Sequence, residues 1–216
     1  MKNIRYFFQA ILIFIFFIIC KLIGYKQSSN LGSLIGASVG PFLRPKNRLR
    51  NNIKKAFLNI EEDKIDNISK NMWKNYGRIL SEYNFIKNFR NSNLKKYISI
   101  EGKEILLNIK QNKNPVIFIS GHFNNFELLA MIIEEAGVDL AALYRPLNNF
   151  FLNKIIVNIR KKYICKKQIP KGITGVKDMA KEFKNGTSLA LMIDQRVSQG
   201  VKVDFFNHPA YTTTLP

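Results

Sequence analysis

The sequence predicts an α/β protein with a mixed sheet flanked by helices and an N-terminal membrane helix. Three observations lead to this class. A nearly unbroken apolar segment opens the chain, a helical pattern follows it to about residue 89, and strands then alternate with helices. A βαβα order implies a sheet in which some strands are parallel. We therefore expect a membrane anchor over residues 1–25, a helical membrane-proximal region over 26–95 and an α/β core over 96–216.

The apolar segment runs from Tyr6 to Ile23 and is interrupted only by Gln9 and Lys21. At about 1.5 Å per residue, such a helix reaches most of the way across a bilayer core of about 30 Å. A buried core helix and a cleaved signal peptide are the alternatives. Apolar residues surround the helix instead of forming a stripe, and no small-residue cleavage site follows Cys20, so an uncleaved anchor is favoured. Because positive charge is denser after the segment, we expect the bulk of the chain in the cytoplasm.

The composition calls for an anionic partner. The chain has 34 Lys and Arg against 15 Asp and Glu, a net charge of +19, and its hydrophobic fraction of 46% is too high for a disordered basic tail. Nucleic acid, anionic lipid, a phosphorylated substrate and an acidic protein all fit this charge. Part of it follows from a bias towards Lys, Asn and Ile, as AT-rich coding produces, and needs no function. Cys20 and Cys165 cannot make a disulfide framework, which favours a reducing compartment.

Two helices are expected between the anchor and the α/β core. Residues 44–57 predict a basic amphipathic helix, suited to an anionic bilayer or to packing on a domain, with a plain solvated helix as the alternative. A second helix covers about 64–89. Glycines and prolines before the basic helix predict that the helical structure is interrupted there. They are Gly32, Gly36, Gly40, Pro41 and Pro45.

In the α/β core, ligands are expected beyond the carboxyl ends of the parallel strands. Polar residues that directly follow a strand are therefore the candidates for a site. The expected strands are 116–119, 138–144, 188–193 and 202–206, and the expected helices are 125–136, 149–163 and 175–184.

His122 and Glu127 follow the first expected strand, in the segment SGHFNNFE. With His122 in the turn and Glu127 in the first helical turn, the two side chains can meet. A carboxylate that accepts from one ring nitrogen leaves the other free as a base, and a substrate hydroxyl is its natural target because no G-x-S-x-G elbow accompanies the pair. The alternative is a histidine bonded to backbone, with Glu127 at a helix N-terminus. Ligands for zinc are too few, so no metal is expected.

Charged residues also follow the next two strands. Arg145 comes after the second strand, where a guanidinium can bind a phosphate or stabilise an oxyanion; an exposed loop arginine is the alternative. Asp194 and Gln195 come after the third strand. Asp194 can hold Arg145 or another donor in place, or it can cap a helix or turn.

Taken in order, these motifs resemble the lipid A biosynthesis late acyltransferases, the lauroyl and myristoyl transferases of the lysophospholipid acyltransferase superfamily. HFNNFE, YRPLNN, IDQ and FFNHPAYTT follow one another, after RLRNNIKKAF and MWKNYGRILSEY in the helical region, where Glu82 stands at the family's usual acidic position. H-x4-D/E belongs to the wider superfamily, whereas YRP-x-N and FF-x-x-P-A-x-T are specific to this branch and its close relatives. The resemblance covers residues 48–216 and implies a glycerolipid-acyltransferase-like fold.

The resemblance also implies roles for the site residues. His122 would deprotonate an acceptor hydroxyl, and Glu127 would orient His122 and stabilise its charged form. The hydroxyl would attack the acyl thioester directly, without a covalent acyl-enzyme, and Arg145 would serve the oxyanion or a phosphate of the acceptor. Asn148, Asp194 and Gln195 would line the site.

Three substitutions depart from the family pattern. Asn124 stands where Gly is frequent, and Asn tolerates a positive φ best among the other residues. Phe126 stands for Trp and keeps an aromatic surface, and Asn207 replaces a Gly in the FFG stretch. The family continues beyond T-x-x-x-P, so we expect the C-terminal part of the domain to be missing.

The function expected from these features is O-acyl transfer in lipid A, and hence lipopolysaccharide, biosynthesis. The acyl donor would be acyl carrier protein or acyl-CoA, and the acceptor would be a lipid A precursor. The enzyme would act at the inner (plasma) membrane, with its catalytic domain on the cytoplasmic face against an anionic membrane surface. No cofactor is expected. The alternatives are the same chemistry on another glycolipid or a lysophospholipid, and a catalytically dead, membrane-bound basic protein. No nucleic acid is expected, because the chain lacks any RNP, zinc-finger or helix-turn-helix signature.

Overall fold

The computed structural model of the protein describes residues 2–194, 200–205 and 207–212. The chain forms two compact units, Met1–Phe85 and Ile86–Pro216. Each unit has its own packing, and each is described separately below.

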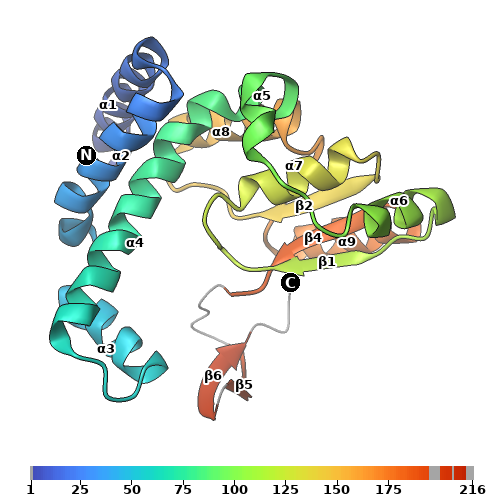
Figure 1. The fold of residues 1–216 in the computed structure, drawn as a ribbon. Coiled ribbons are helices and arrows are strands. Elements are labelled where there is room, and N and C mark those ends of the chain that lie inside the picture. Colours follow the sequence, from blue (N-terminus) through green and yellow to red (C-terminus); the bar gives the residue numbers. More distant parts are fainter. Residues whose placement is uncertain (1, 195–199, 206, 213–216) are drawn as a thin grey trace. The chain divides into compact units, whose positions relative to one another are not determined.

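The first unit is helical (Figure 1). Its elements are α1 (Lys2–Ile23), α2 (Tyr25–Leu43), α3 (Lys46–Ala56), α4 (Glu62–Glu82) and the short 3-10 helix η1 (Tyr83–Phe85). Among the helices of the described residues, α1 alone is long and apolar enough to cross a membrane, by length and composition. Only 6% of its most apolar window is buried within the protein, so its surface does not resemble that of a core helix.

The break predicted before the basic helix occurs only at Pro45, between the end of α2 and the start of α3. At the three glycines and at Pro41 the prediction is wrong, because α2 continues through all of them. Gly32, Gly36 and Gly40 lie four residues apart on the side of α2 that faces α4. A Cβ atom at Gly32 would collide with the backbone of Gly77, and one at Gly40 would collide with the ring of Trp73. The glycines therefore allow two helix backbones to pack at close range, as small residues spaced by four do in membrane helices.

Polar contacts complete the packing of α2 on α4. The Ser29 hydroxyl donates to Glu82 Oε1 at 3.1 Å, and Arg78 Nη1 donates to Ser29 Oγ at 3.1 Å and to Asn30 Oδ1 at 3.2 Å. The acidic residue singled out from the sequence, Glu82, thus helps to join the two helices. The basic helix α3 is tied to α4 as well, because Arg50 forms ion pairs with α4 carboxylates.

The second unit is an α/β layer structure, so the predicted fold class is confirmed. Four strands form a parallel sheet in the order β1-β4-β2-β3. Its elements are α5 (Ile86–Asn91), η2 (Asn93–Tyr97), α6 (Lys103–Asn112), β1 (Ile117–Ser120), α7 (Glu127–Glu135), β2 (Leu140–Tyr144), α8 (Phe150–Tyr163), β3 (Lys167–Pro170), α9 (Ile173–Lys184), β4 (Ser188–Met192), β5 (Val201–Phe205) and β6 (His208–Thr212).

Two details of the sheet differ from the prediction. The sequence analysis missed β3, which is a four-residue edge strand with a single buried residue, Ile169, and too little apolar pattern to be recognised. The strand expected at 202–206 does exist as β5, but it pairs with β6 in an antiparallel hairpin separate from the main sheet.

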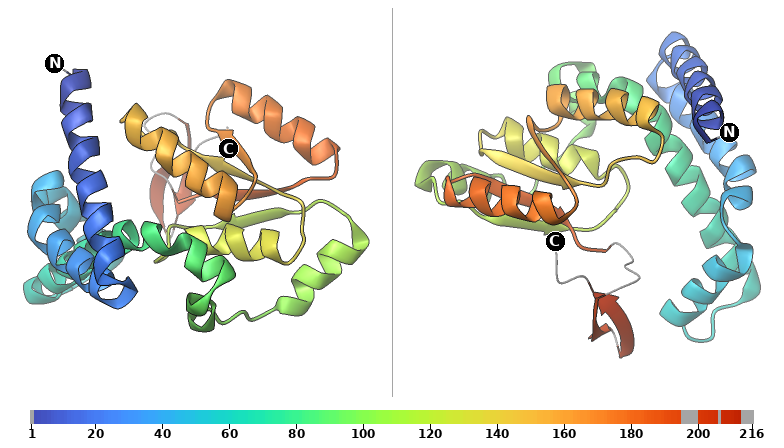
Figure 2. Two further views of the ribbon diagram at one scale, coloured as in Figure 1. Left: turned by 90° about the horizontal axis from the view of Figure 1, so that it is seen from above. Right: turned by 180° about the vertical axis from the view of Figure 1, so that it is seen from behind.

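Helices cover both faces of the parallel sheet. α7 and α8 lie on one face and α9 on the other (Figures 1 and 2). On the α9 side, Met179 packs against Ala141, Ile169 and Leu189 from three different strands. Because the four strands are parallel, all their carboxyl ends lie at one edge, and the residues that follow them gather there.

Candidate active site

His122 lies at the carboxyl end of β1, in the tight turn that leads into α7. The turn depends on Asn124, whose φ is +44°. This residue adopts the left-handed conformation predicted for the Asn that replaces the family's Gly. The ring of Phe126 meets the imidazole of His122 edge-on, with the centroids 4.6 Å apart, so the aromatic surface expected at this position packs directly on the histidine.

Asp194, which follows β4, binds His122 at two points. Its Oδ2 accepts from the backbone N–H of His122 at 2.7 Å, and its Oδ1 lies 2.7 Å from the ring Nδ1. Gly121 makes this approach possible, because a Cβ there would lie 3.1 Å from Oδ2 and 2.8 Å from the Phe123 ring. The two strand ends are neighbours because β1 pairs with β4.

The Asp194 carboxyl has a lowered pKa. Partial burial by itself would raise that pKa, but the hydrogen bonds from the backbone and ring of His122, together with attraction to the ring charge, outweigh it. Asp194 is therefore ionised at neutral pH and can only accept hydrogen bonds. Nδ1 of His122 must then donate, and a neutral ring presents an unprotonated Nε2.

Glu127, in the first turn of α7, is paired with Arg160 of α8. Arg160 Nε lies 3.0 and 3.2 Å from the two carboxylate oxygens, and its Nη2 also donates to Oε1. The side chains are 7% and 15% exposed, so the charges are largely removed from water and depend on each other. The Arg160 guanidinium also stacks over the ring of Tyr144, 5.8 Å from its centroid.

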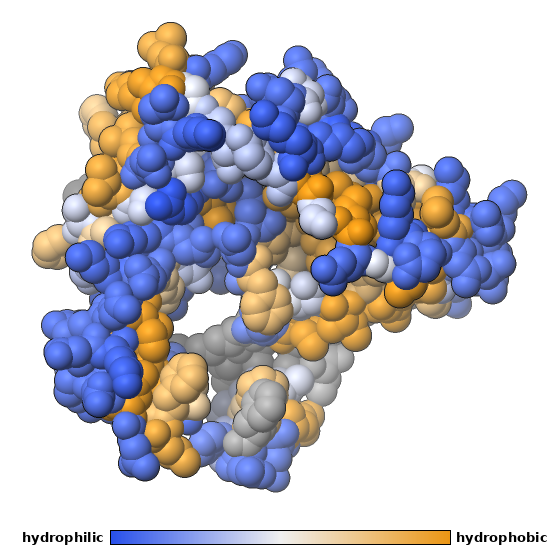
Figure 3. All heavy atoms as spheres, in the orientation of Figure 1, coloured by the Kyte–Doolittle hydropathy of each residue, from blue (hydrophilic) through white to orange (hydrophobic). Residues whose placement is uncertain are grey.

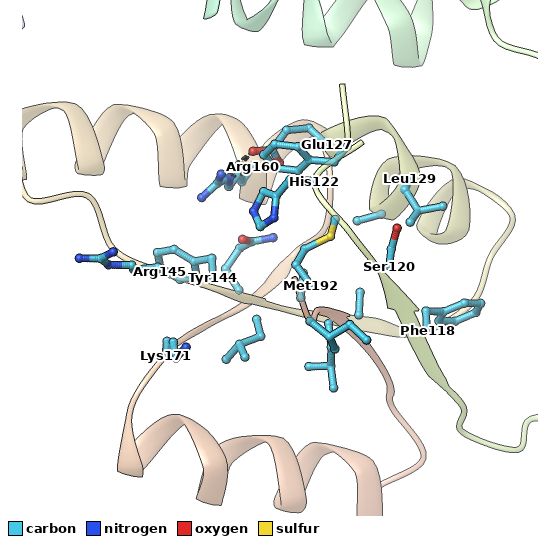
Figure 4. A pocket seen from close by; sticks show the side chains of 18 of the residues that line it. Phe118, Ser120, His122, Glu127, Leu129, Tyr144, Arg145, Arg160, Lys171 and Met192 are labelled. Atoms are coloured by element: carbon cyan, nitrogen blue, oxygen red, sulfur yellow. Dashed lines mark hydrogen bonds and ion pairs between the residues drawn. The ribbon is translucent and has the colours of Figure 1, made fainter. Parts of the chain in front are cut away.

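A cavity of about 830 Å³ lies beside these groups, on the carboxyl side of the sheet. Figure 4 shows His122, Glu127 and Arg160 together at one end, with Met192, Leu129 and Phe118 contributing further wall. Most of its lining side chains are apolar, and its volume is within the range of small-molecule and cofactor sites. Its lining side chains with titratable or amide groups are His122, Glu127, Tyr144, Arg145, Asn148, Arg160, Gln168 and Lys171.

The structure gathers most of the residues predicted for the site. The cavity is lined by His122, Glu127, Arg145 and Asn148. Asp194 is outside the lining and contacts Nδ1 of His122. Gln195 lies outside the described residues. The carboxylate found on Nδ1 is Asp194, whereas the sequence analysis assigned the orienting role to Glu127 and expected Asp194 to hold Arg145 or another donor.

Sequence reasoning missed Arg160 and Lys171, which both line the cavity. A buried carboxylate such as Glu127 needs a cation as its partner. Nothing in the sequence, however, identifies Arg160, 33 residues away, as that partner. Lys171 follows β3, so it was missed together with its strand. Within the described ranges no group of three or more His, Cys, Asp or Glu side chains is arranged to hold a metal ion.

Comparison with known families decides the assignment. The family model of the bacterial lipid A biosynthesis acyltransferases matches residues 1–216. The chain belongs to this family. No curated protein matches it. Membership in the lipid A acyltransferase family confirms the resemblance and implies that the protein is an acyltransferase of lipid A biosynthesis.

Proposed function

We propose that this protein transfers a fatty acyl chain from acyl carrier protein or acyl-CoA to a hydroxyl of a lipid A precursor. The observation that carries the proposal is the placement of His122, at a strand end, with its ring held by Asp194 and its side chain on the wall of a large apolar cavity. An acyl chain needs an apolar cavity, and a hydroxyl needs a base to become a nucleophile.

In the proposed mechanism, Nε2 of His122 takes the proton of the acceptor hydroxyl while the hydroxyl oxygen attacks the thioester carbonyl carbon. The resulting oxyanion collapses, the carbon–sulfur bond breaks, and the leaving thiolate receives the proton from the imidazolium. The products are an ester and a free thiol. Asp194 stabilises the imidazolium between the two proton transfers, because an ionised carboxylate lies 2.7 Å from Nδ1.

Direct attack requires no nucleophile from the protein. Cys165 is fully buried, and burial raises the pKa of its thiol to about 11, so it stays protonated at neutral pH. We therefore assign no acyl-enzyme to this residue.

Glu127 and Arg160 complete the proposed site. The family resemblance makes Glu127 the carboxylate partner of His122 in a catalytic dyad. We propose that Glu127 adds negative charge that stabilises the imidazolium, while Asp194 orients the ring, and that its ion pair with Arg160 fixes a cation at the cavity wall. Arg145, also on the wall, serves the oxyanion or a phosphate of the acceptor. Asn148 and Gln195 are proposed to contact substrate as well.

We further propose that the enzyme acts at the inner membrane, with its catalytic unit on the cytoplasmic face. Figure 3 shows apolar side chains gathered over α1 and α2. On α2, Leu34 and Phe42 are 66% and 89% exposed on the side opposite the glycines, and Arg44 and Lys46 follow directly. An apolar surface bordered by cations matches an anionic bilayer.

The test is acyl transfer by purified protein, supplied with acyl carrier protein or coenzyme A thioesters and with a lipid A precursor, another glycolipid or a lysophospholipid as acceptor. We expect turnover on the lipid A precursor and a loss of about 100-fold or more in kcat for His122→Ala, since general base catalysis contributes 10²–10⁴-fold. The exposed variant His208→Ala is the matched control. Turnover retained in His122→Ala would falsify the mechanism, and turnover on another acceptor alone would reassign the substrate.

A further inference from the structure

Two cations lie side by side at the carboxyl edge of the sheet. Tyr144 and Pro170, the last residues of β2 and β3, are partners in the parallel register. The backbone pairing continues one step further, because the N–H of Lys171 donates to the Tyr144 carbonyl at 2.7 Å. Arg145 and Lys171 are therefore the next matching positions on neighbouring strands, whose backbones are about 4.8 Å apart in a sheet.

Both side chains line the cavity that contains His122 (Figure 4). Both are exposed. Within the described ranges neither Arg145 nor Lys171 has an ion pair or a side-chain hydrogen bond. Like charges at adjacent positions repel each other, and a bound anion would offset that repulsion. The protein itself supplies no such anion among the residues described.

Several cations beside this sheet are paired with carboxylates of the protein. Lys167 is paired with Asp139 and Glu182, and Arg90 with Glu134. Even the cation inside the cavity, Arg160, has its own carboxylate. Acidic side chains are scarce, 15 against 34 basic ones, and exposed lysines such as Lys177 have no ion pair within the described ranges either. Arg145 and Lys171 differ from those lysines because they occupy adjacent positions on neighbouring strands at the wall of the cavity. An anionic group of a ligand bound in this cavity could contact both side chains, and we expect such a group to be their partner.

We propose that Arg145 and Lys171 together bind a phosphate group of a substrate while its reacting atom lies at His122. The planar guanidinium can bind two phosphate oxygens at once, and the ammonium adds a point charge from the neighbouring strand. This inference rests on the proposed acyl transfer and deepens it by assigning Lys171, which no motif pointed to. The phosphate has two possible sources, a phosphorylated sugar of the acceptor and the phosphopantetheine arm of the donor.

Steady-state kinetics of Lys171→Met test the site. Loss of a charge-assisted contact that forms on binding should raise KM for the phosphate-bearing substrate about 10-fold or more and change kcat little. Lys177→Met, an exposed lysine of α9 away from the cavity, should leave both constants unchanged. If the acceptor carries the phosphate, the effect disappears with a dephosphorylated acceptor. If the donor carries it, the effect disappears with an acyl thioester of N-acetylcysteamine, which has no phosphate.

A second measurement does not depend on turnover. Line broadening of inorganic phosphate in phosphorus NMR reports binding to the full chain in detergent, and it should weaken several-fold in Lys171→Met but not in Lys177→Met. Unchanged KM values together with unchanged phosphate binding in Lys171→Met overturn the site, even if acyl transfer is demonstrated. Phosphate binding that requires Lys171 in a protein without acyl transfer would leave the site standing and overturn the proposed function instead.

Discussion

At the scale of single residues, the two carboxylates of the site bind different partners. Asp194 is bound to His122 and is partly exposed, whereas Glu127 is buried against Arg160. A sequence motif that spaces a His and an acid by five residues cannot reveal this division. Each acid is held by a residue at least 33 positions away, and such pairs form only when the sheet and its helices assemble.

Asp194→Asn is expected to lower kcat by about 100-fold or more, because the imidazolium loses its ionised partner and Nδ1 is no longer required to donate. KM should change little, since Asp194 does not line the cavity. The measurement is the pH profile of kcat, and the control is Asp178→Asn on the exposed side of α9.

Asp194→Asn should also change the stability of the protein in a way that depends on pH. The folded pKa of Asp194 lies below its ordinary value of 3.8, so its contribution to stability is present above pH 3.8 and is lost as the pH falls through the lower folded value. Urea denaturation should therefore show Asp194→Asn to be less stable than wild type at neutral pH, and the difference should shrink in acid. An equal difference at both pH values contradicts the role given to this carboxylate.

At the scale of elements, the sequence was sufficient wherever one strong local pattern existed. The apolar α1, the strands β1, β2 and β4, and the helices between them were located from periodicity and from turn residues. It was insufficient where the meaning of a residue depends on a distant partner. Three glycines in α2 look like a break until α4 is placed against them, and β3 exists only because β2 offers an edge to pair with.

The close packing of α2 on α4 can be tested at Gly77. A Cβ at this position would collide with the carbonyl oxygen of Gly32, and that contact is backbone on both sides, so no side chain can move away. Gly77→Leu should destabilise the protein by about 1–3 kcal/mol or more, as overpacking does. Lys70→Ala, on the exposed side of α4, should stay within about 0.5 kcal/mol of wild type in the same denaturation experiment. Equal stability of the two variants would show that the helices are not held this closely.

At the scale of the whole molecule, the charge of +19 and the apolar helix α1 would attach the protein to a membrane in different ways. Charge alone gives a peripheral attachment that salt removes, because at about 1 M salt the screening length falls to about 3 Å. An apolar helix inserted in the bilayer is insensitive to salt. In the proposed membrane-bound enzyme both interactions would involve the same lipid surface, so only a variant that alters one of them can separate their contributions.

Arginine substitutions in α1 separate the contribution of the apolar helix from that of the charge. Leu12 and Ile19 are exposed on α1, and each arginine at a membrane-buried position costs about 2.5–3.5 kcal/mol on insertion scales. Wild-type protein should stay with sedimented membranes after a high-salt wash, and the double variant Leu12→Arg, Ile19→Arg should be released by it. Asn71→Arg, which adds positive charge on the exposed side of α4, should remain bound. Release of wild-type protein by salt alone would mean that the basic surface, and not α1, holds the enzyme at its lipid substrate.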